Sequence, residues 1–116
     1  MKYQVSLEAA NNALKQDPTQ PFTELLRHGS LTVEWYAPQH EDAQGPHKQD
    51  ELYIIASGHG TFLRDGQRSP FQKGDVLFVP AGMKHRFEDF SHDFATWVVF
   101  YGPEGGESPL SPQGGT

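Results

Sequence analysis

A histidine and a glutamate lie four residues apart in the segment PHKQDELYIIASG, which otherwise has the composition of a strand entering a protein core. Imidazole nitrogen and carboxylate oxygen are both ligands of divalent metals. Alternation along an extended chain places five side chains of this segment on one face: His47, Gln49, Glu51, Tyr53 and Ile55. If this face points inward, one strand brings two metal ligands, His47 and Glu51, into the interior.

A third candidate ligand comes from a separate hairpin. In GDVLFVPAGMKHRFEDF, residues 74–90, His85 follows a Pro-Ala-Gly turn. The same alternation turns Phe87 inward with His85 and leaves Arg86 and Glu88 outward. Two histidines and one carboxylate form the facial ligand set of non-haem iron sites, which leaves coordination positions free for water, dioxygen or substrate. We therefore expect an open and reactive metal site.

The spacing of these residues resembles the paired motifs of the cupin superfamily. The first motif reads His47, three residues, Glu51, six residues, Gly58. The second reads Gly74, five residues, Pro80, one residue, Gly82, two residues, His85. Glycine and proline at these offsets set turn geometry, so their expected role is to place His85 rather than to bind a ligand. The resemblance covers roughly residues 30 to 102.

Cupins fold as an all-β, double-stranded β-helix, a jelly-roll barrel in which the two motifs meet to hold a divalent metal. The resemblance thus implies that His47, Glu51 and His85 bind one such ion, with iron, manganese, nickel, zinc and copper all left open. Most cupins carry a further histidine two residues before the first motif histidine, where this chain has Gly45. Gln44 or His40 is then the candidate fourth ligand, provided that the loop bulges.

Composition narrows the class of protein. The chain has 116 residues, enough for one domain with a single core, and no cysteine, which excludes disulfides and thiolate metal sites. The formal net charge is -6, without a lysine or arginine cluster, which argues against nucleic acid or an anionic membrane as a partner. No apolar run has the length of a signal peptide or a membrane span, so we expect a soluble, cytoplasmic protein.

The chain divides into three parts. Residues 1–20 form an N-terminal arm with a short helix over 6–16, where Ser6 can cap and Asp17-Pro18 ends the segment. Residues 21–102 carry the barrel, in which turn residues separate seven apolar or alternating runs. The Gly-, Pro- and Ser-rich residues 103–116 form a tail that we expect to be flexible or loosely draped. Residues 40–49 are a polar loop leading into the strand of the first motif.

The inward alternation also predicts the surroundings of the metal. We expect four residues to line the pocket: Gln49, Tyr53, Ile55 and Phe87. This largely apolar lining suits a small organic molecule with one or two polar groups, and it suits a phosphorylated sugar poorly. The function best matched is a metal-dependent, dioxygenase-like enzyme, although isomerases, decarboxylases and lyases share the scaffold.

Two other functions stay open. A non-catalytic cupin could bind or sense a small molecule, with the metal only orienting it, and a metal-free structural cupin could hold the same residues as satisfied polar groups. His28, His59 and His92 sit in turn-like contexts and are expected to be solvated loop residues. Dioxygen uptake distinguishes the enzyme from the binding protein.

The segment FATWVVFYG, residues 94–102, is apolar on both faces. A surface sheet with one solvated face does not need this pattern. Small cupins form dimers through sheet packing, so the resemblance and the two-sided strand together predict a homodimer.

Overall fold

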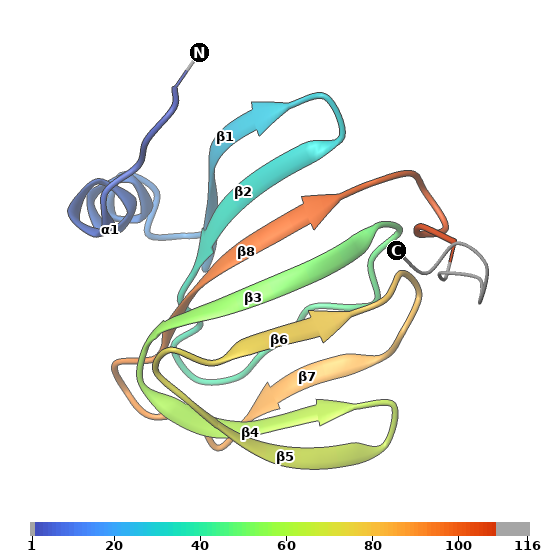
Figure 1. Cartoon of the computed structure of the whole chain (residues 1–116). Coiled ribbons are helices and arrows are strands. Elements are labelled where there is room, and N and C mark those ends of the chain that lie inside the picture. The colour runs from blue at the N-terminus through green and yellow to red at the C-terminus, as the bar shows by residue number, and fades with distance from the viewer. Residues whose placement is uncertain (1, 109–116) are drawn as a thin grey trace.

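One helix and eight strands make up residues 2–108, the part of the chain that the computed structural model describes (Figure 1). The helix, α1, is Leu7–Lys15. The strands follow in chain order: β1 (Phe22–His28), β2 (Leu31–Tyr36), β3 (Asp50–Ser57), β4 (His59–Arg64), β5 (Gln67–Gln72), β6 (Val76–Val79), β7 (His85–Glu88) and β8 (Ala95–Tyr101). The expected all-β fold with a short N-terminal helix is confirmed.

The strands form two antiparallel sheets that face each other (Figure 1). The larger has the order β1-β2-β8-β3-β6 and the smaller has the order β5-β4-β7. β3 and β4 are joined through Gly58 and run from one sheet into the other. Because β3 pairs with β8 and β6, it lies inside the larger sheet and its position is set on both sides.

Of the eight strands, β5 is the one that corresponds to none of the seven predicted runs. Its sequence, QRSPFQ, is polar, contains a proline and buries only Phe71, so its composition does not resemble a strand. It forms because the Asp65-Gly66 turn has positive φ at both positions, which is the geometry of a tight hairpin, and because β5 is an edge strand. Pro70 has no N–H to donate, and an edge strand tolerates this because only one of its sides pairs with another strand.

Between the two sheets lies an aromatic core. Its buried members are Tyr36, Tyr53, Ile55, Phe62, Phe71, Val79, Phe87, Phe94 and Val98. Ring centroids of neighbouring aromatics lie 4.7 to 5.2 Å apart for the pairs of Phe87 with Tyr53, Phe71 and Phe94, within the range of favourable aromatic packing. This core fills one end of the barrel and supports the strands that carry the motif residues.

The helix α1 covers the outer face of the larger sheet. Ser6 accepts a hydrogen bond from the Ala9 N–H at 3.0 Å, which confirms the predicted cap. Ala10 is fully buried in a second cluster with Trp35 and Ala95, and Trp97 packs against this cluster. Helix α1 of the same chain thus covers part of the outer face of β8, a contact that the sequence pattern did not indicate. No helix in residues 2–108 is long and apolar enough to span a membrane.

The first residues of the predicted tail bind to the barrel. The Gly105 N–H donates to the carbonyl of Lys48 at 2.7 Å, and the Glu107 N–H donates to the Asp50 carboxylate at 2.8 Å. Asp50 is almost fully buried at the start of β3. Residues 103–108 therefore close over the beginning of the strand that carries Glu51, and the rest of the predicted tail, 109–116, lies outside the described residues.

Gly58, which ends the first motif, cannot be replaced without strain. Its φ is +85°, and a Cβ there would lie 2.6 Å from the Phe94 Cα. We expect Gly58→Ala to lower the free energy of unfolding by at least about 3 kcal/mol, measured by urea denaturation. Gly66→Ala is the matched control, because Gly66 has φ +79° and open space, so only the backbone cost of about 1 kcal/mol applies. Equal losses in the two variants would contradict the close approach.

Candidate metal centre

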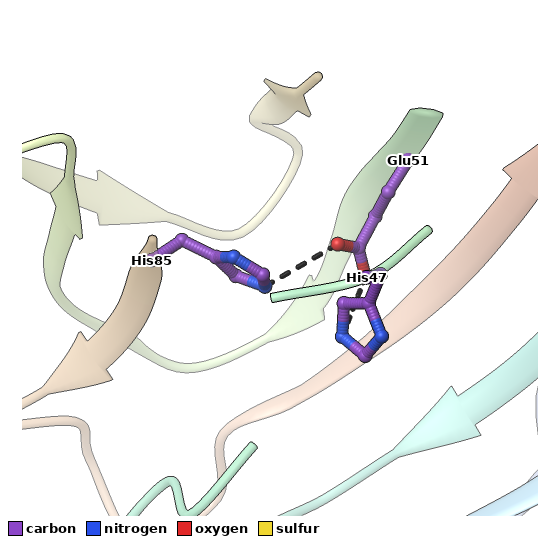
Figure 2. A group of neighbouring side chains, drawn as sticks. All are labelled: His47, Glu51 and His85. Carbon is purple, nitrogen blue, oxygen red and sulfur yellow. Dashed lines mark ion pairs between the residues drawn. The ribbon is translucent and has the colours of Figure 1, made fainter. Parts of the chain in front are cut away.

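Three side chains converge inside the mouth of the barrel: His47, Glu51 and His85 (Figure 2). Glu51 projects from β3, His47 from the loop just before it, and His85 from the first position of β7. One ligand-type atom from each residue lies within 4.8 Å of the other two. The His85 Nε2 is 3.3 Å from Glu51 Oε1, and the His47 Nε2 is 3.9 Å from Glu51 Oε2. The structure thus brings together the three residues that the motifs single out.

These distances suit a shared ion. Ligands bonded to one metal at about 2.1 Å lie about 3 to 4 Å from each other. The two histidine rings are 5.3 Å apart between centroids and tilted by 45°, so their nitrogen atoms approach the carboxylate from different directions. A set of two imidazoles and one carboxylate is a donor set that divalent transition metals accept.

Glu51 supplies the test of fit. Its side chain is 0% exposed, and neither carboxylate oxygen has a hydrogen-bond partner among the described residues. Burial raises the pKa of Glu51 to about 8. A buried carboxylate without partners is costly, and a cation bonded directly to its oxygens compensates that cost. The cluster could therefore hold a metal ion, and its donor set fits one.

His85 is held in the orientation that a ligand needs. Its Nδ1 lies 3.0 Å from the carbonyl of Met83, which can only accept, so Nδ1 carries the proton. The Nε2 of the neutral ring is then free of hydrogen and faces Glu51 and the Tyr53 hydroxyl, the latter at 3.0 Å. Fixing one ring nitrogen by a backbone carbonyl is how metal-binding histidines are commonly oriented.

His47 is half-buried at the entrance of the cluster. Its ring packs edge to face on Phe100 with 4.8 Å between centroids. Burial lowers the pKa of His47, and the nearby His85 lowers it further, so the neutral ring is favoured. A neutral imidazole is the form that binds metals.

Of the two candidate fourth ligands, only Gln44 reaches the cluster. The Gln44 Oε1 lies 3.0 Å from the His47 Nε2. The same amide donates through Nε2 to the Tyr53 hydroxyl at 2.9 Å and to Asp42 at 3.1 Å. His40 is exposed and lines a different cavity with Arg86, so the structure does not bring it to the cluster. Gln44 thus brings an amide oxygen to the cluster from the residue before Gly45, the position at which most cupins carry the further histidine.

Asp42 anchors this loop, and the sequence pattern missed it. Its carboxylate is 5% exposed and accepts hydrogen bonds from the Tyr36 hydroxyl at 2.5 Å and from the Phe87 N–H at 2.9 Å. It also accepts from the Gln44 N–H at 3.2 Å, a local turn two residues along the chain. That local turn is the one signal in the sequence. The partners on β2 and β7 come from tertiary structure.

The two motif segments are tied together through the main chain. The Gly82 N–H donates to the carbonyl of His47 at 2.8 Å, and the Ala81 N–H donates to the Asp50 carboxylate at 2.9 Å. Gly82 has φ +80°, which favours glycine at that position. The turn before His85 is therefore joined directly to the segment that carries His47 and Glu51.

The four residues predicted to line the pocket take three different places. Tyr53 lies against the cluster, with its hydroxyl near His85. Ile55 and Phe87 do point inward, but they belong to the packed aromatic core. Gln49 lies before β3 begins, and its amide donates to the carbonyls of Ser30 and Gly102 at 2.9 and 3.0 Å. The assumed alternation from His47 to Glu51 fails at Gln49 because that stretch is a bend rather than a strand.

A cavity of about 440 Å³ opens beside His47. Its wall is formed by Gln20, Pro21, Phe22, Glu34, Tyr36, Glu41, Ala43, Gln44, His47, Val98 and Phe100. A second, more polar cavity of about 570 Å³ opens beside His85 on the other side of the loop that carries Gln44. The volume beside His47 is that of a site for a small organic molecule. Its wall contains the aromatic rings of Phe22, Tyr36 and Phe100, but none of the four residues that were predicted to line the pocket.

The fold and the cluster define a small cupin barrel. Residues 32–101 match the family model described as Cupin domain, and this range is more than half of the chain. The uncharacterized protein SCO3923 of Streptomyces coelicolor is 35% identical over 85 residues, which cover 72% of this chain and 81% of that protein. The chain therefore belongs to the cupin family, as its motifs predicted.

Solved structures agree with this fold. A Cupin 2 conserved barrel domain protein from Salinispora arenicola has a TM-score of 0.62 at 20% identity, covering 88% of this chain and 89% of that one. The EutQ protein of Clostridium difficile has a TM-score of 0.59 at 18% identity, covering 72% and 67%. At such identities the similarity concerns the fold alone.

Proposed function

We propose that this cupin is a metal-dependent enzyme that acts on a small organic molecule bound in the cavity beside His47. The observation that carries the proposal is the buried Glu51, whose oxygens face two histidines and have no hydrogen-bond partner within residues 2–108. A structural carboxylate would be expected to accept hydrogen bonds in such a place. The cavity next to the cluster supplies the room for a substrate.

His47, Glu51 and His85 would hold the ion, with the Gln44 carbonyl oxygen as a fourth ligand. Iron, manganese, nickel, zinc and copper all accept this donor set. Such a metal, when bound, acts as a Lewis acid, and in the case of Fe(II) it also supports dioxygenase-like chemistry.

The chain's own residues orient and shield the site. Met83 fixes the proton on His85 Nδ1, and this directs Nε2 toward Glu51. Burial raises the pKa of Tyr53 well above its usual value, so its hydroxyl stays protonated and can donate a hydrogen bond beside the metal ligands. Tyr36 and Phe100 exclude water from the adjoining wall of the cavity.

The metal assignment makes a direct prediction. His47→Ala and His85→Ala should each lower metal affinity by at least about tenfold, and Glu51→Gln should weaken binding while keeping the fold. Chelation should lower the melting temperature of the wild type by about 5 to 15 °C, because bound metal stabilises only the folded state. Chelation should barely change the melting temperature of the His85→Ala protein. Elemental analysis and thermal denaturation provide the two measurements.

His92→Ala is the matched control, because His92 is exposed and lies outside the cluster. It should keep the metal content and the chelator response of the wild type. If titrated Fe(II), Mn(II), Ni(II), Zn(II) and Cu(II) all leave the melting temperature of the wild type unchanged, the metal assignment is wrong and the metal-free structural cupin takes its place.

Catalysis is tested separately from metal binding. Fe(II)-loaded protein mixed with a pool of small organic compounds should consume dioxygen at least about tenfold faster than the His85→Ala protein under the same conditions. An oxygen electrode records the uptake, and mass spectrometry identifies the compound consumed. Metal-loaded protein that binds a compound without converting it would instead be a binding or sensing cupin.

We further propose that two copies of the chain associate through the outer face of β3 and β6. Ile54, Val76 and Phe78 on these strands are 39%, 60% and 42% exposed, which is unusual for neighbouring large apolar residues. Ile54 and Val76 are direct partners in the register of the two strands. Because α1 already covers Trp97 on β8, this neighbouring surface is the better candidate for the predicted dimer.

Light scattering at tens of micromolar should therefore give twice the mass of the chain. Phe78→Glu should shift the protein to monomer, because it places a charge in the centre of the apolar face. Tyr3→Glu, which changes a still more exposed aromatic residue before α1, should leave the dimer intact. A monomeric wild type would remove the dimer from consideration.

A further inference from the structure

Two carboxylates face the cavity beside His47. Glu34 comes from β2 and Glu41 from the loop before the first motif. No lysine or arginine belongs to the part of the cavity wall that the structure describes. The wall therefore carries negative charge that nothing in it balances.

Glu34 is unusual among the acidic residues of the sheet. It is half-buried, and no hydrogen bond or ion pair reaches its carboxylate from any residue between 2 and 108. Its cross-strand neighbour is Glu24, and burial together with the charge of Glu24 raises the pKa of Glu34. Arg27, whose positive charge offsets part of this rise in pKa, pairs with Glu24 at 2.6 Å and is not part of the cavity wall. A positive group entering the cavity would relieve this unfavourable arrangement.

The rest of the wall suits an organic cation. The rings of Phe22, Tyr36 and Phe100 line the same cavity as the two carboxylates. Aromatic faces attract ammonium groups, and they do so more strongly where water is excluded. Carboxylates and aromatic rings in one small cavity form the usual chemical environment for binding an amine.

The strand register sets the distance between this acidic end and the metal cluster. Glu34 lies opposite Val98 on β8, and Val98 lies opposite Tyr53 on β3. Two strand spacings, or about 10 Å, therefore separate the backbone of Glu34 from that of Tyr53. Glu51 is fully buried, and its carboxylate has no hydrogen-bond partner in the described part of the chain, so it independently marks the far end as the place where a ligand would meet the metal.

We propose that the substrate or ligand of this cavity is an organic amine whose ammonium group is bound by Glu34 and Glu41. The other end of the amine is a small aromatic or aliphatic group that lies toward His47. This inference rests on the proposed function and adds the class of ligand. The cavity beside His85 is a poorer match, because its wall contains Lys84 and Arg86 as well as acidic residues.

A matched series of three probes tests the charge preference: tyramine, tyrosol and 4-hydroxyphenylacetate. All three carry a phenol, and the group at the other end is a positive ammonium, a neutral hydroxyl and a negative carboxylate, respectively. Calorimetric titration of Zn(II)-loaded protein at pH 7 should show tyramine binding at least about tenfold more tightly than 4-hydroxyphenylacetate, with tyrosol between them. Glu34→Gln should reduce tyramine affinity by about tenfold and leave tyrosol affinity unchanged.

Glu8→Gln is the matched control. It makes the same change in net charge on the exposed surface of α1, away from the cavity, and should bind all three probes as the wild type does. Metal content and melting temperature are measured for each variant, so that a loss of fold or of metal is recognised as such. Because Glu34→Gln is nearly isosteric and half-buried, it should stay folded.

The same titrations on chelated protein separate this inference from the metal assignment. If the protein binds no metal but still binds tyramine in a way that depends on Glu34, the amine site is supported and the metal-dependent function is wrong. Metal-loaded protein that prefers 4-hydroxyphenylacetate, treats the three probes alike, or binds none of them at millimolar concentration overturns the amine site. An affinity for tyramine that Glu34→Gln does not change overturns it as well.

Discussion

The burial of one carboxylate is the constraint around which this barrel is organised. Glu51 lies on a strand with neighbours on both sides, so its side chain cannot turn back to water. An ionised carboxylate in such a place costs several kcal/mol unless a cation or hydrogen bonds compensate it. The residues that face it are His47 and His85, whose neutral rings can share an ion with it. The loops and strands around Glu51 must therefore hold it and the two histidines in a fixed arrangement.

Hydrogen bonds between loops, rather than additional apolar packing, hold these three groups in position. Asp50 and Asp42 are both buried, and each accepts hydrogen bonds from main-chain N–H groups of distant segments. Together with the bond from Gly82 to His47, they fix the loops at the mouth of the barrel. The aromatic core at the other end holds the strands themselves. The two sets meet at Tyr53 and Tyr36, whose rings belong to the core and whose hydroxyls bond to His85 and Asp42.

Much of this arrangement is local in the sequence and could be predicted from it. The motif spacings identified the barrel and the three clustered side chains, because ligand-type residues and the turn residues that place them are visible in the sequence. Ser6 as the cap of α1 followed from residue type alone. The strand β5 was missed, because its polar composition carries no strand signal and its tight hairpin with β4 forms it.

Contacts between segments distant in sequence were decided by tertiary structure alone. The alternation that predicted Gln49 in the pocket assumed a strand that begins before Asp50, and only the folded chain shows the bend there. No pattern in the sequence singles out Glu34, and only the sheet order places it two strands from Tyr53. The sequence by itself determined which side chains could bind a metal, since ligand chemistry and motif spacing are local properties. Which charges face the cavity depends on how the sheets pair and close, and no local pattern encodes that pairing.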